Sequence, residues 1–377
     1  MAGTEQVLEI LVNLKEADNV KRNLAESLLK QLRSEQPQQL FSGLHQIISA
    51  TANVDNQNQI MGAVILKKFF LDKRKEEEGL WQLSTEEFRQ LKDFMLASID
   101  FSQPMLFLKK KADIIASCYR EIENYPELIQ QLVQVLQSQD GTPEQLGIKK
   151  VYAMYIFELL AEYHLPQEQI VQNSSQFIEL FSGCLKDPNI TVKVAALKAI
   201  TSFLGSIDDE SAVLKYQGMM DWILDVVIEV LRSDEDKGKA SLESMIELSQ
   251  THGDIWSQVM PKLIFVVAQI IQNQTFEDST RQSALEIVNS LSEGIPTLLR
   301  KHQADLKAHL FPSLMHMLAQ PLYQESLEEW NQYEEEELQA RNDVASIAAD
   351  SINRIASFLG EKTIIASTTH LIKEAID

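Results

Sequence analysis

Cysteine, glycine and proline are scarce in this sequence, and each scarcity excludes a class of protein. The 377 residues include only two cysteines, Cys118 and Cys184, and both lie among apolar residues, so we expect buried thiols rather than a disulfide or a metal site. The 13 glycines and 10 prolines, without any low-complexity tract, argue against long linkers and disorder. No apolar run reaches the roughly 20 residues of a membrane helix, and the polar start MAGTEQ does not resemble a signal peptide. A soluble, intracellular protein is therefore expected.

Catalytic motifs are also lacking. There is no glycine-rich phosphate loop, no G-x-S-x-G motif and no Cys/His pair at zinc-binding spacing. His302, His309 and His316 recur every seven residues, which on one helix separates them by roughly 10 Å, too far to share a metal ion. We interpret them as surface histidines. No catalytic residue, metal site or cofactor is predicted, and the chain is not expected to be an enzyme.

The acidic excess is confined to one part of the chain. Residues 1–120 contain 16 basic and 16 acidic side chains, whereas residues 121–377 contain 18 basic and 39 acidic ones, which accounts for the net charge of −21. Such a field repels nucleic acid and anionic membranes and attracts basic partners. The alternative is that the acidity only promotes solubility.

The stretch from Lys186 to Gly205 is the clearest copy of a repeated unit. Asp187-Pro188-Asn189 ends one apolar run, because proline cannot continue a helix. The apolar residues that follow recur every three or four positions, which predicts a helix that ends near Gly205; they are Val192, Ala195, Ala196, Ala199, Ile200 and Phe203. The preceding run, Phe177 to Leu185, supplies the partner helix. A hairpin of this kind must pack against similar neighbours to bury its apolar face.

Comparable hairpins recur along the whole chain. Their second helices are predicted to begin near residues 19, 57, 105, 147, 190, 236, 279 and 343, close to the period of roughly 40 to 47 residues of HEAT repeats, apart from the last gap. We therefore predict an all-α fold, a right-handed α-solenoid of about eight HEAT hairpins plus a partial ninth, which forms the N-terminal part of a longer solenoid. The predicted repeats of this single domain, residues 1–377, are 1–33, 35–71, 84–121, 124–163, 166–206, 209–252, 254–294, 297–360 and 361–377.

Local patterns add detail to some of these hairpins. Ser233-Asp234 is predicted to cap the second helix of the sixth hairpin, and Asp278 or Ser279 that of the seventh. The second helix of the first hairpin is predicted to bury an apolar stripe made up of Leu24, Ala25, Leu28, Leu29 and Leu32.

The eighth hairpin carries about 20 surplus residues, an acidic insertion at residues 322–340 with the sequence LYQESLEEWNQYEEEELQA. Like charges so close together are unfavourable unless a cationic partner or solvent relieves them. Trp330 lies among the carboxylates and would add contact area to a partner interface. The alternative is a solvated loop whose Trp330 caps a neighbouring hairpin.

Two basic clusters occupy comparable positions on second helices. They are Lys67-Lys68 in the second hairpin and Lys109-Lys110-Lys111 in the third. They could form one cationic strip on the inner face of the solenoid. Charge balance against nearby acids, including Asp72 and Asp113, is the alternative.

With the repeats in place, the sequence resembles the N-terminal part of an importin-β (karyopherin-β) nuclear transport receptor, most closely the importin five subfamily. The stretches that carry the resemblance are DNVKRNLAESLLKQL (18–32), ILKKFF (65–70), DPNITVKVAALKAITSFL (187–204), SLESMIEL (241–248), SALEIVNSLSEGIP (283–296), and LEEWNQYEEEE followed by ARNDVASIAADSINRIASFLG (327–360). The order of these stretches, together with an acidic insertion in the eighth repeat, is more specific than any single HEAT motif.

The resemblance implies a monomeric receptor that shuttles between cytoplasm and nucleus. Its partners would be the GTPase Ran in the GTP form, cargo with basic nuclear localisation signals, and the phenylalanine-glycine (FG) repeats of nuclear pore proteins, without nucleic acid or membrane. The implied Ran contacts in the first repeats are Asn19, Arg22, Lys67, Lys68 and Lys110. The implied contacts of the acidic loop with Ran or cargo are Glu328, Glu329, Trp330, Glu334, Glu335, Glu336 and Glu337, and the implied FG-repeat contacts are Phe181 and Leu185.

The resemblance also implies a mechanism, in which Ran-GTP and cargo exclude each other on a flexible solenoid. The competing hypothesis is a structural scaffold such as the HEAT subunit of a phosphatase, which would hold partners without nucleotide-dependent release.

Overall fold

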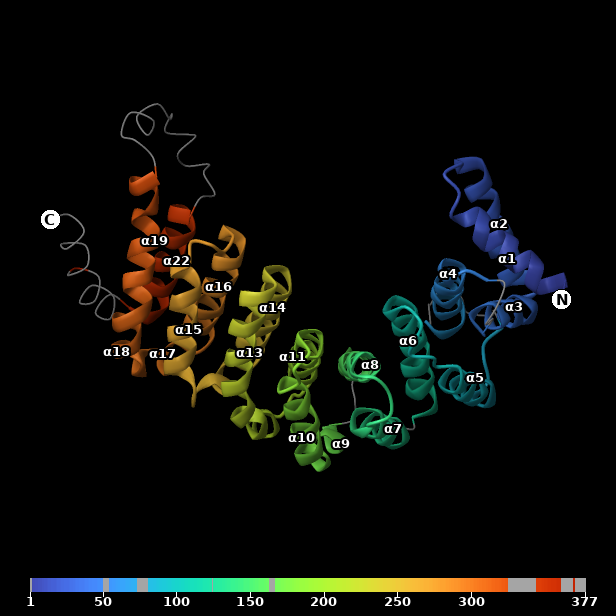
Figure 1. Cartoon of the computed structure of the whole chain (residues 1–377), viewed down its shortest axis with the longest axis horizontal. Helices are drawn as coiled ribbons and strands as arrows, with labels where there is room; N and C mark the ends of the chain where they lie inside the picture. The colour runs from blue at the N-terminus through green and yellow to red at the C-terminus, as the bar shows by residue number, and fades with distance from the viewer. Residues whose placement is uncertain are drawn as a thin grey trace. The chain divides into compact units, whose positions relative to one another are not determined.

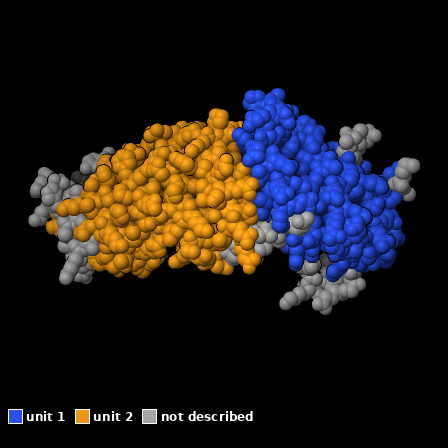
Figure 2. All heavy atoms as spheres, turned by 90° about the horizontal axis from the view of Figure 1, so that it is seen from below, with its two compact units in different colours: residues 1–163 blue, residues 164–377 orange. Residues whose placement is uncertain are grey.

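The computed structural model describes residues 2–49, 54–72, 81–123, 125–162, 167–324, 344–360 and 369, and this part of the chain is helical without any strand (Figure 1). The fold is an all-α HEAT solenoid, as predicted. The chain divides into two compact units, residues 1–163 and residues 164–377 (Figure 2). An array of repeats permits such a division because each repeat contacts only its neighbours.

The first unit is built from successive helical hairpins. Its helices are α1 (Ala2–Leu14), α2 (Asn19–Glu35), α3 (Pro37–Ser49), α4 (Asn56–Leu66), the π-helix η1 (Lys67–Leu71), α5 (Thr85–Ala97), α6 (Met105–Ile122), α7 (Tyr125–Gln137) and α8 (Pro143–Glu162). The second helices α4, α6 and α8 pack side by side, and α1 packs on α3. Helix α2 packs mainly on α1 and α3, which leaves one of its faces without a closely packed neighbour among the described helices.

The second unit repeats the arrangement with short extra turns before its first helices. Its helices are α9 (Gln167–Gln172), α10 (Ser174–Leu185), α11 (Ile190–Gly205), α12 (Glu210–Val213), η3 (Leu214–Met219), α13 (Met220–Ser233), α14 (Glu235–Thr251), η4 (Gly253–Trp256), α15 (Met260–Gln272), α16 (Asp278–Gly294), α17 (Pro296–Lys301), α18 (Gln303–Asp305), η5 (Leu306–Leu310), α19 (Phe311–Gln324) and α22 (Val344–Leu359). One row is formed by α11, α14, α16 and α22, and the other by α10, α13, α15 and α19. The core lies between these rows.

Short polar side chains begin several of the second helices. The carboxylates of Asp18 and Asp234 and the amide oxygen of Asn189 accept hydrogen bonds from backbone N–H groups in the first turns of α2, α14 and α11. Asp234 is therefore the cap expected at Ser233-Asp234. The prediction for α16 was wrong, because this helix begins at Asp278 without a side-chain cap.

The start of α16 is held in a different way. The backbone N–H of Glu277, the residue just before the helix, donates to Glu235 Oε1 at 2.7 Å, so a carboxylate of the preceding repeat binds it. The sequence around the helix start does not reveal a hydrogen-bond acceptor that comes from another repeat, and the prediction missed Glu235 for this reason.

One glycine marks the closest approach of two helices. A Cβ atom at Gly238, in the first turns of α14, would lie 2.8 Å from Leu231 Cα on α13. Real Cβ atoms do not come this close to backbone, so any other residue would push the two helices of this hairpin apart.

The two cysteines are free and buried, as expected. Burial raises the pKa of the Cys118 thiol to about 12, which keeps it protonated. Within the described ranges, no group of histidine, cysteine and acidic side chains is arranged to hold a metal ion. The helices described for this chain also include none that is long and apolar enough to cross a membrane.

The histidines expected on one helical face do not share one regular α-helix. His302 lies between α17 and α18, with its Nδ1 atom 3.3 Å from Asp305 Oδ2. His309 contacts the Phe265 ring edge-on, with 5.2 Å between the ring centroids, and His316 lies 3.3 Å from the amide of Gln274. The regular spacing was therefore misleading, because the chain turns at His302 and is wound as a π-helix through η5.

Candidate partner-binding surfaces

Three exposed apolar side chains of the first unit form a line on α2. Val20, Leu24 and Leu28 follow one another at intervals of four residues and are 76%, 60% and 36% exposed. Spacing by four places them on one face of the helix. The sequence predicted Leu24 and Leu28 in the core, but the core side of α2 contains Ala25, Leu29 and Leu32 instead. We call Val20, Leu24 and Leu28 the α2 stripe.

Two predicted contact residues lie in the first turn of the same helix. Asn19 begins α2 and is exposed, and Arg22 is half-buried one turn further on. The guanidinium of Arg22 donates a hydrogen bond to the side-chain oxygen of Asn19. Both residues lie in the first turn of α2, but their spacing of one and two residues from Val20 places them off the face that carries the α2 stripe.

The three lysines predicted as contacts lie around one cavity. Lys67 and Lys68 from η1 and Lys110 from α6 line a space of about 310 Å³, together with Ala63, Val64, Asp72 and Asp113. We call this the lysine pocket. The chain changes from α-helix to a turn of π-helix at Lys67, and such local widening of a helix is frequent at functional sites.

The pocket also contains the balancing charges that the sequence suggested. Lys110 donates to Asp113 Oδ2 at 2.9 Å, and the hydroxyl of Tyr155 on α8 donates to Asp113 Oδ1 at 2.8 Å. Asp113 is thus a buried anchor that holds Lys110 in place. Lys68 is exposed and makes no ion pair with another described residue, so it is the lysine most available to a partner.

The neighbouring lysines do not join the pocket. Lys111 is buried and donates to the carbonyl oxygen of Ser98 at 2.6 Å and to Gln103 Oε1 at 3.2 Å. Burial lowers the pKa of Lys111 to about 8. Lys109 lies over the Tyr155 ring, 4.5 Å from its centroid. Of the three consecutive lysines, Lys111 therefore belongs to the core, whereas Lys109 and Lys110 do not. The predicted continuous cationic strip is corrected in this respect, because it cannot include Lys111.

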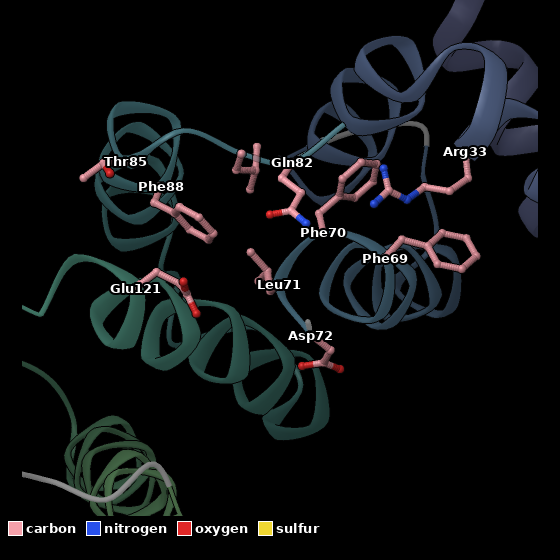
Figure 3. A pocket seen from close by; sticks show the side chains of 10 residues that line it. Arg33, Phe69, Phe70, Leu71, Asp72, Gln82, Thr85, Phe88 and Glu121 are labelled. Carbon is pink, nitrogen blue, oxygen red and sulfur yellow. The ribbon is translucent and has the colours of Figure 1, made fainter. Parts of the chain in front are cut away.

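A second cavity of the first unit lies where the second and third hairpins meet (Figure 3). It has a volume of about 230 Å³, and its lining comes from the ends of α2, η1 and α6 and from the start of α5. Arg33 donates to the carbonyl oxygen of Trp81 at 2.9 Å, with its guanidinium carbon 4.5 Å from the centre of the Phe70 ring. Arg120 donates to the carbonyl oxygen of Leu71 at 2.9 Å. These arginines tie the joint between repeats together, and we assign the cavity to this structural role.

The residues predicted to contact FG repeats lie in the core. Phe181 is 0% exposed and Leu185 is 2% exposed. The Phe181 ring packs against Phe203 of α11, with 5.5 Å between the ring centroids. In this structure their side chains offer no surface to a peptide. They stabilise the α10–α11 hairpin.

An accessible groove lies one hairpin further along, between the first helices α13 and α15. It encloses about 320 Å³ and is lined by Ile228, Leu231, Arg232, Gln269, Ile270, Gln272, Asn273 and Phe276. We call it the α13–α15 groove. Its residues come from two helices about 40 positions apart in sequence, and no local pattern in the sequence identifies it.

The acidic-loop residues Glu328, Glu329, Trp330 and Glu334 to Glu337 lie outside the described residues. The helix that follows them, α22, is held by Arg354. Its Nη1 and Nη2 atoms donate to the two carboxylate oxygens of Glu286 at 2.6 and 2.9 Å, and its Nε donates to Glu293 at 2.7 Å. These hydrogen bonds raise the pKa of Arg354 above its usual value and fasten α22 to α16.

Two rows of stacked helices, with an apolar stripe and a lysine pocket on second helices, define a HEAT-repeat protein suited to binding other proteins. Comparison with known proteins supports this assignment to a class of protein. A family described as "IPO5-like, TPR repeats" matches residues 105–266, and one described as "Importin repeat" matches residues 273–366. The chain belongs to the importin-β family of karyopherins.

Individual relatives are distant in sequence but match over most of this chain. It is 22% identical to importin subunit beta-3 of Saccharomyces cerevisiae over 98% of its length, and 22% identical to a probable importin-5 homolog of Dictyostelium discoideum over 62%. It spans 34% and 21% of the lengths of these relatives. The chain thus corresponds to about a third or less of either relative.

Solved structures show the same fold. The crystal structure of Kap121p superposes with a TM-score of 0.79 at 20% identity, covering 99% of this chain and 34% of Kap121p. Kap121p bound to RanGTP gives 0.78 at 19% identity, with 99% and 34% coverage, and Kap121p bound to Nup53p gives 0.77 at 21%, with 100% and 35% coverage.

Proposed function

We propose that this chain is part of a nuclear import receptor that binds Ran in its GTP form through the α2 stripe and the lysine pocket. The observation that carries the proposal is the exposure of Val20, Leu24 and Leu28. Three large apolar side chains in line on one helix face form the kind of apolar surface that protein partners cover. Kap121p, which has the same fold, has been crystallised with RanGTP.

The charges around the stripe indicate what the partner must present. Asn19 and Arg22 lie in the first turn of the helix that carries the stripe, and Lys67, Lys68 and Lys110 belong to the same unit. A partner surface with an apolar centre and acidic side chains around it complements this arrangement. Such charges chiefly increase the rate of association and select the partner, while the apolar contact supplies most of the affinity.

The second unit suits basic ligands, because most of the acidic excess of the chain lies there. We propose that the acidic insertion, with Glu328, Glu329, Trp330 and Glu334 to Glu337, contacts a basic patch on Ran or on cargo. Ran-GTP bound at two separated regions would favour a curvature that cargo cannot share, because small rotations between hairpins add up along a solenoid. Release of cargo in the nucleus then follows from mutually exclusive binding, and the receptor, as a monomer, shuttles between cytoplasm and nucleus.

The nucleotide state of Ran provides the test. Titration of this chain with Ran loaded with GTP or with GDP, followed by isothermal calorimetry, should show affinity at least about tenfold higher for the GTP form, a difference of about 1.4 kcal/mol. Equal affinities would contradict the proposal and would favour a scaffold without nucleotide-dependent release.

We also propose that FG repeats bind in the α13–α15 groove. It presents apolar side chains, Ile228 and Phe276 among them, at the rim of a space of about 320 Å³. A phenylalanine ring of a pore protein would fill such a space, and Kap121p has been crystallised with Nup53p.

Replacing Ile228 by aspartate and Phe276 by serine in one variant should weaken binding of an FG-repeat peptide about tenfold, because the ring would lose its apolar contacts. Biolayer interferometry with immobilised peptide measures the change. Phe358→Ser is the matched control, since Phe358 is an exposed aromatic on α22, away from the groove. An equal effect of the control, or none from the double variant, would show that the peptide binds elsewhere.

A further inference from the structure

A cavity of about 420 Å³ lies where the sixth hairpin passes into the seventh, larger than the other cavities described above. Its walls come from α12 and η3, from the end of α14 with the η4 turn, and from the end of α16. We call it the joint cavity. Its volume falls within the range of sites that hold small ligands or single side chains of a partner.

One wall of the joint cavity is aliphatic. Val213 and Ile255 are buried, Ile295 is half-buried, and Leu214 remains 42% exposed although it lines the cavity. An occupant with a flexible apolar stem would cover Leu214 and remove this surface from water.

The other wall is rich in hydrogen-bond acceptors. The side-chain amide of Gln217 donates to Ser257 Oγ at 2.6 Å and to the carbonyl oxygen of Asp254 at 3.3 Å, and that of Gln250 donates to Ser290 Oγ at 3.4 Å. These bonds use the NH₂ end of each amide. The carbonyl oxygens of Gln217 and Gln250 accept no hydrogen bond from another described residue.

The lining of the joint cavity also includes acidic side chains. Glu210 and Asp254 line it and are exposed, and no lysine or arginine is among its lining residues. His252 is the remaining titratable group of the lining. Burial lowers its pKa, although the charge of Glu210, a hydrogen bond with the backbone of Leu204 and the charge of Asp208 oppose this shift, and the lowered pKa favours the neutral imidazole, which does not repel a cation.

We propose that the joint cavity binds an arginine side chain from an extended segment of a protein partner. Arginine combines an apolar stem, which suits Leu214, with a planar group of five N–H donors, which suits two amide oxygens and two carboxylates. Lysine has a similar stem but a compact, strongly hydrated charge with fewer donors. The inference does not depend on Ran binding, because the α2 stripe and the lysine pocket share no residue with the joint cavity.

Short peptides provide the probes. The full chain would be titrated with acetyl-Gly-Arg-Gly-amide, with its lysine analogue, and with its citrulline analogue, which keeps the shape of arginine but lacks the charge. The NMR signals of the His252 ring and of ¹³C-labelled leucine methyl groups, Leu214 included, report on occupancy. The arginine peptide should shift both sets of signals in a saturable way, and the lysine and citrulline peptides should bind at least about fivefold more weakly.

Variants that remove charge from the lining test whether the arginine peptide binds in the joint cavity. Glu210→Gln combined with Asp254→Asn should weaken binding of the arginine peptide about tenfold, while Glu179→Gln, the same change at an exposed position of α10, should leave it unchanged. Neither Glu210 nor Asp254 makes a side-chain bond to another described residue, so the fold should tolerate the double variant. Equal affinity for arginine and citrulline peptides, equal binding by the double variant, or no saturable shift below roughly 10 mM would each overturn the proposal.

Discussion

Replacing Arg281 by methionine is expected to lower the free energy of unfolding of the second unit by about 3 kcal/mol, the largest stability effect that we anticipate. Arg281 is 1% exposed on α16. Its Nε donates to the carbonyl oxygen of Ile271 on α15 and its Nη2 to Gln320 Oε1 on α19, both at 2.9 Å. Methionine retains the apolar stem but leaves both acceptors buried without a donor.

Urea unfolding followed by circular dichroism would measure this loss as a shift of the transition assigned to the second unit. Arg232→Met on α13 is the matched control, because Arg232 is exposed and makes no ion pair with another described residue, and it should change stability by less than about 0.5 kcal/mol. If both variants unfold alike, the bonds of Arg281 do not hold the seventh and eighth hairpins together.

Replacing Leu24 by glutamate is expected to weaken the binding of Ran-GTP by about 30-fold or more, with little change in stability. Leu24 is the middle residue of the α2 stripe and is 60% exposed, so the folded chain alone loses few contacts when it is replaced. At the centre of an interface, a buried carboxylate without a partner would cost about 2 kcal/mol or more.

Calorimetric titration with Ran-GTP would measure the affinity, and thermal unfolding would verify the fold. Val12→Glu introduces the same charge at an apolar residue of α1 that is 40% exposed and lies outside the stripe, and it should change affinity by less than about twofold. Normal binding by Leu24→Glu would refute the assignment of the α2 stripe. A similar loss in both variants would point to a general effect of negative charge on this unit.

Helix boundaries were largely predictable because their signals are local. The capping oxygens of Asp18, Asn189 and Asp234 bind N–H groups two or three residues further along, and such pairs can be found from the sequence alone. The start of α16 shows the limit of this reasoning. The backbone N–H of Glu277, just before this helix, donates a hydrogen bond to Glu235, which lies 42 residues away in the sequence. No local pattern reveals such a bond.

The candidate sites were less predictable because helical spacing shows which side chains share a face but not which face is covered. Leu24 and Ala25 are adjacent and both belong to apolar patterns, yet one is exposed and the other is buried. Lys110 and Lys111 are adjacent lysines, yet one reaches a pocket and the other the core. In each case, a side chain is buried or exposed according to whether a neighbouring helix covers it.

The sequence by itself determined the helical class, the repeat period, the first turns of most second helices and the unequal distribution of charge, because each depends on neighbouring residues or on composition alone. Only the tertiary structure decided that Leu24 and Leu28 are exposed, that Phe181 and Leu185 are core residues, and that lysines from two hairpins line one pocket. These properties depend on contacts between different helices, about 20 residues apart for Phe181 and about 40 for the lysine pocket, and burial of a side chain is settled by the surface that covers it.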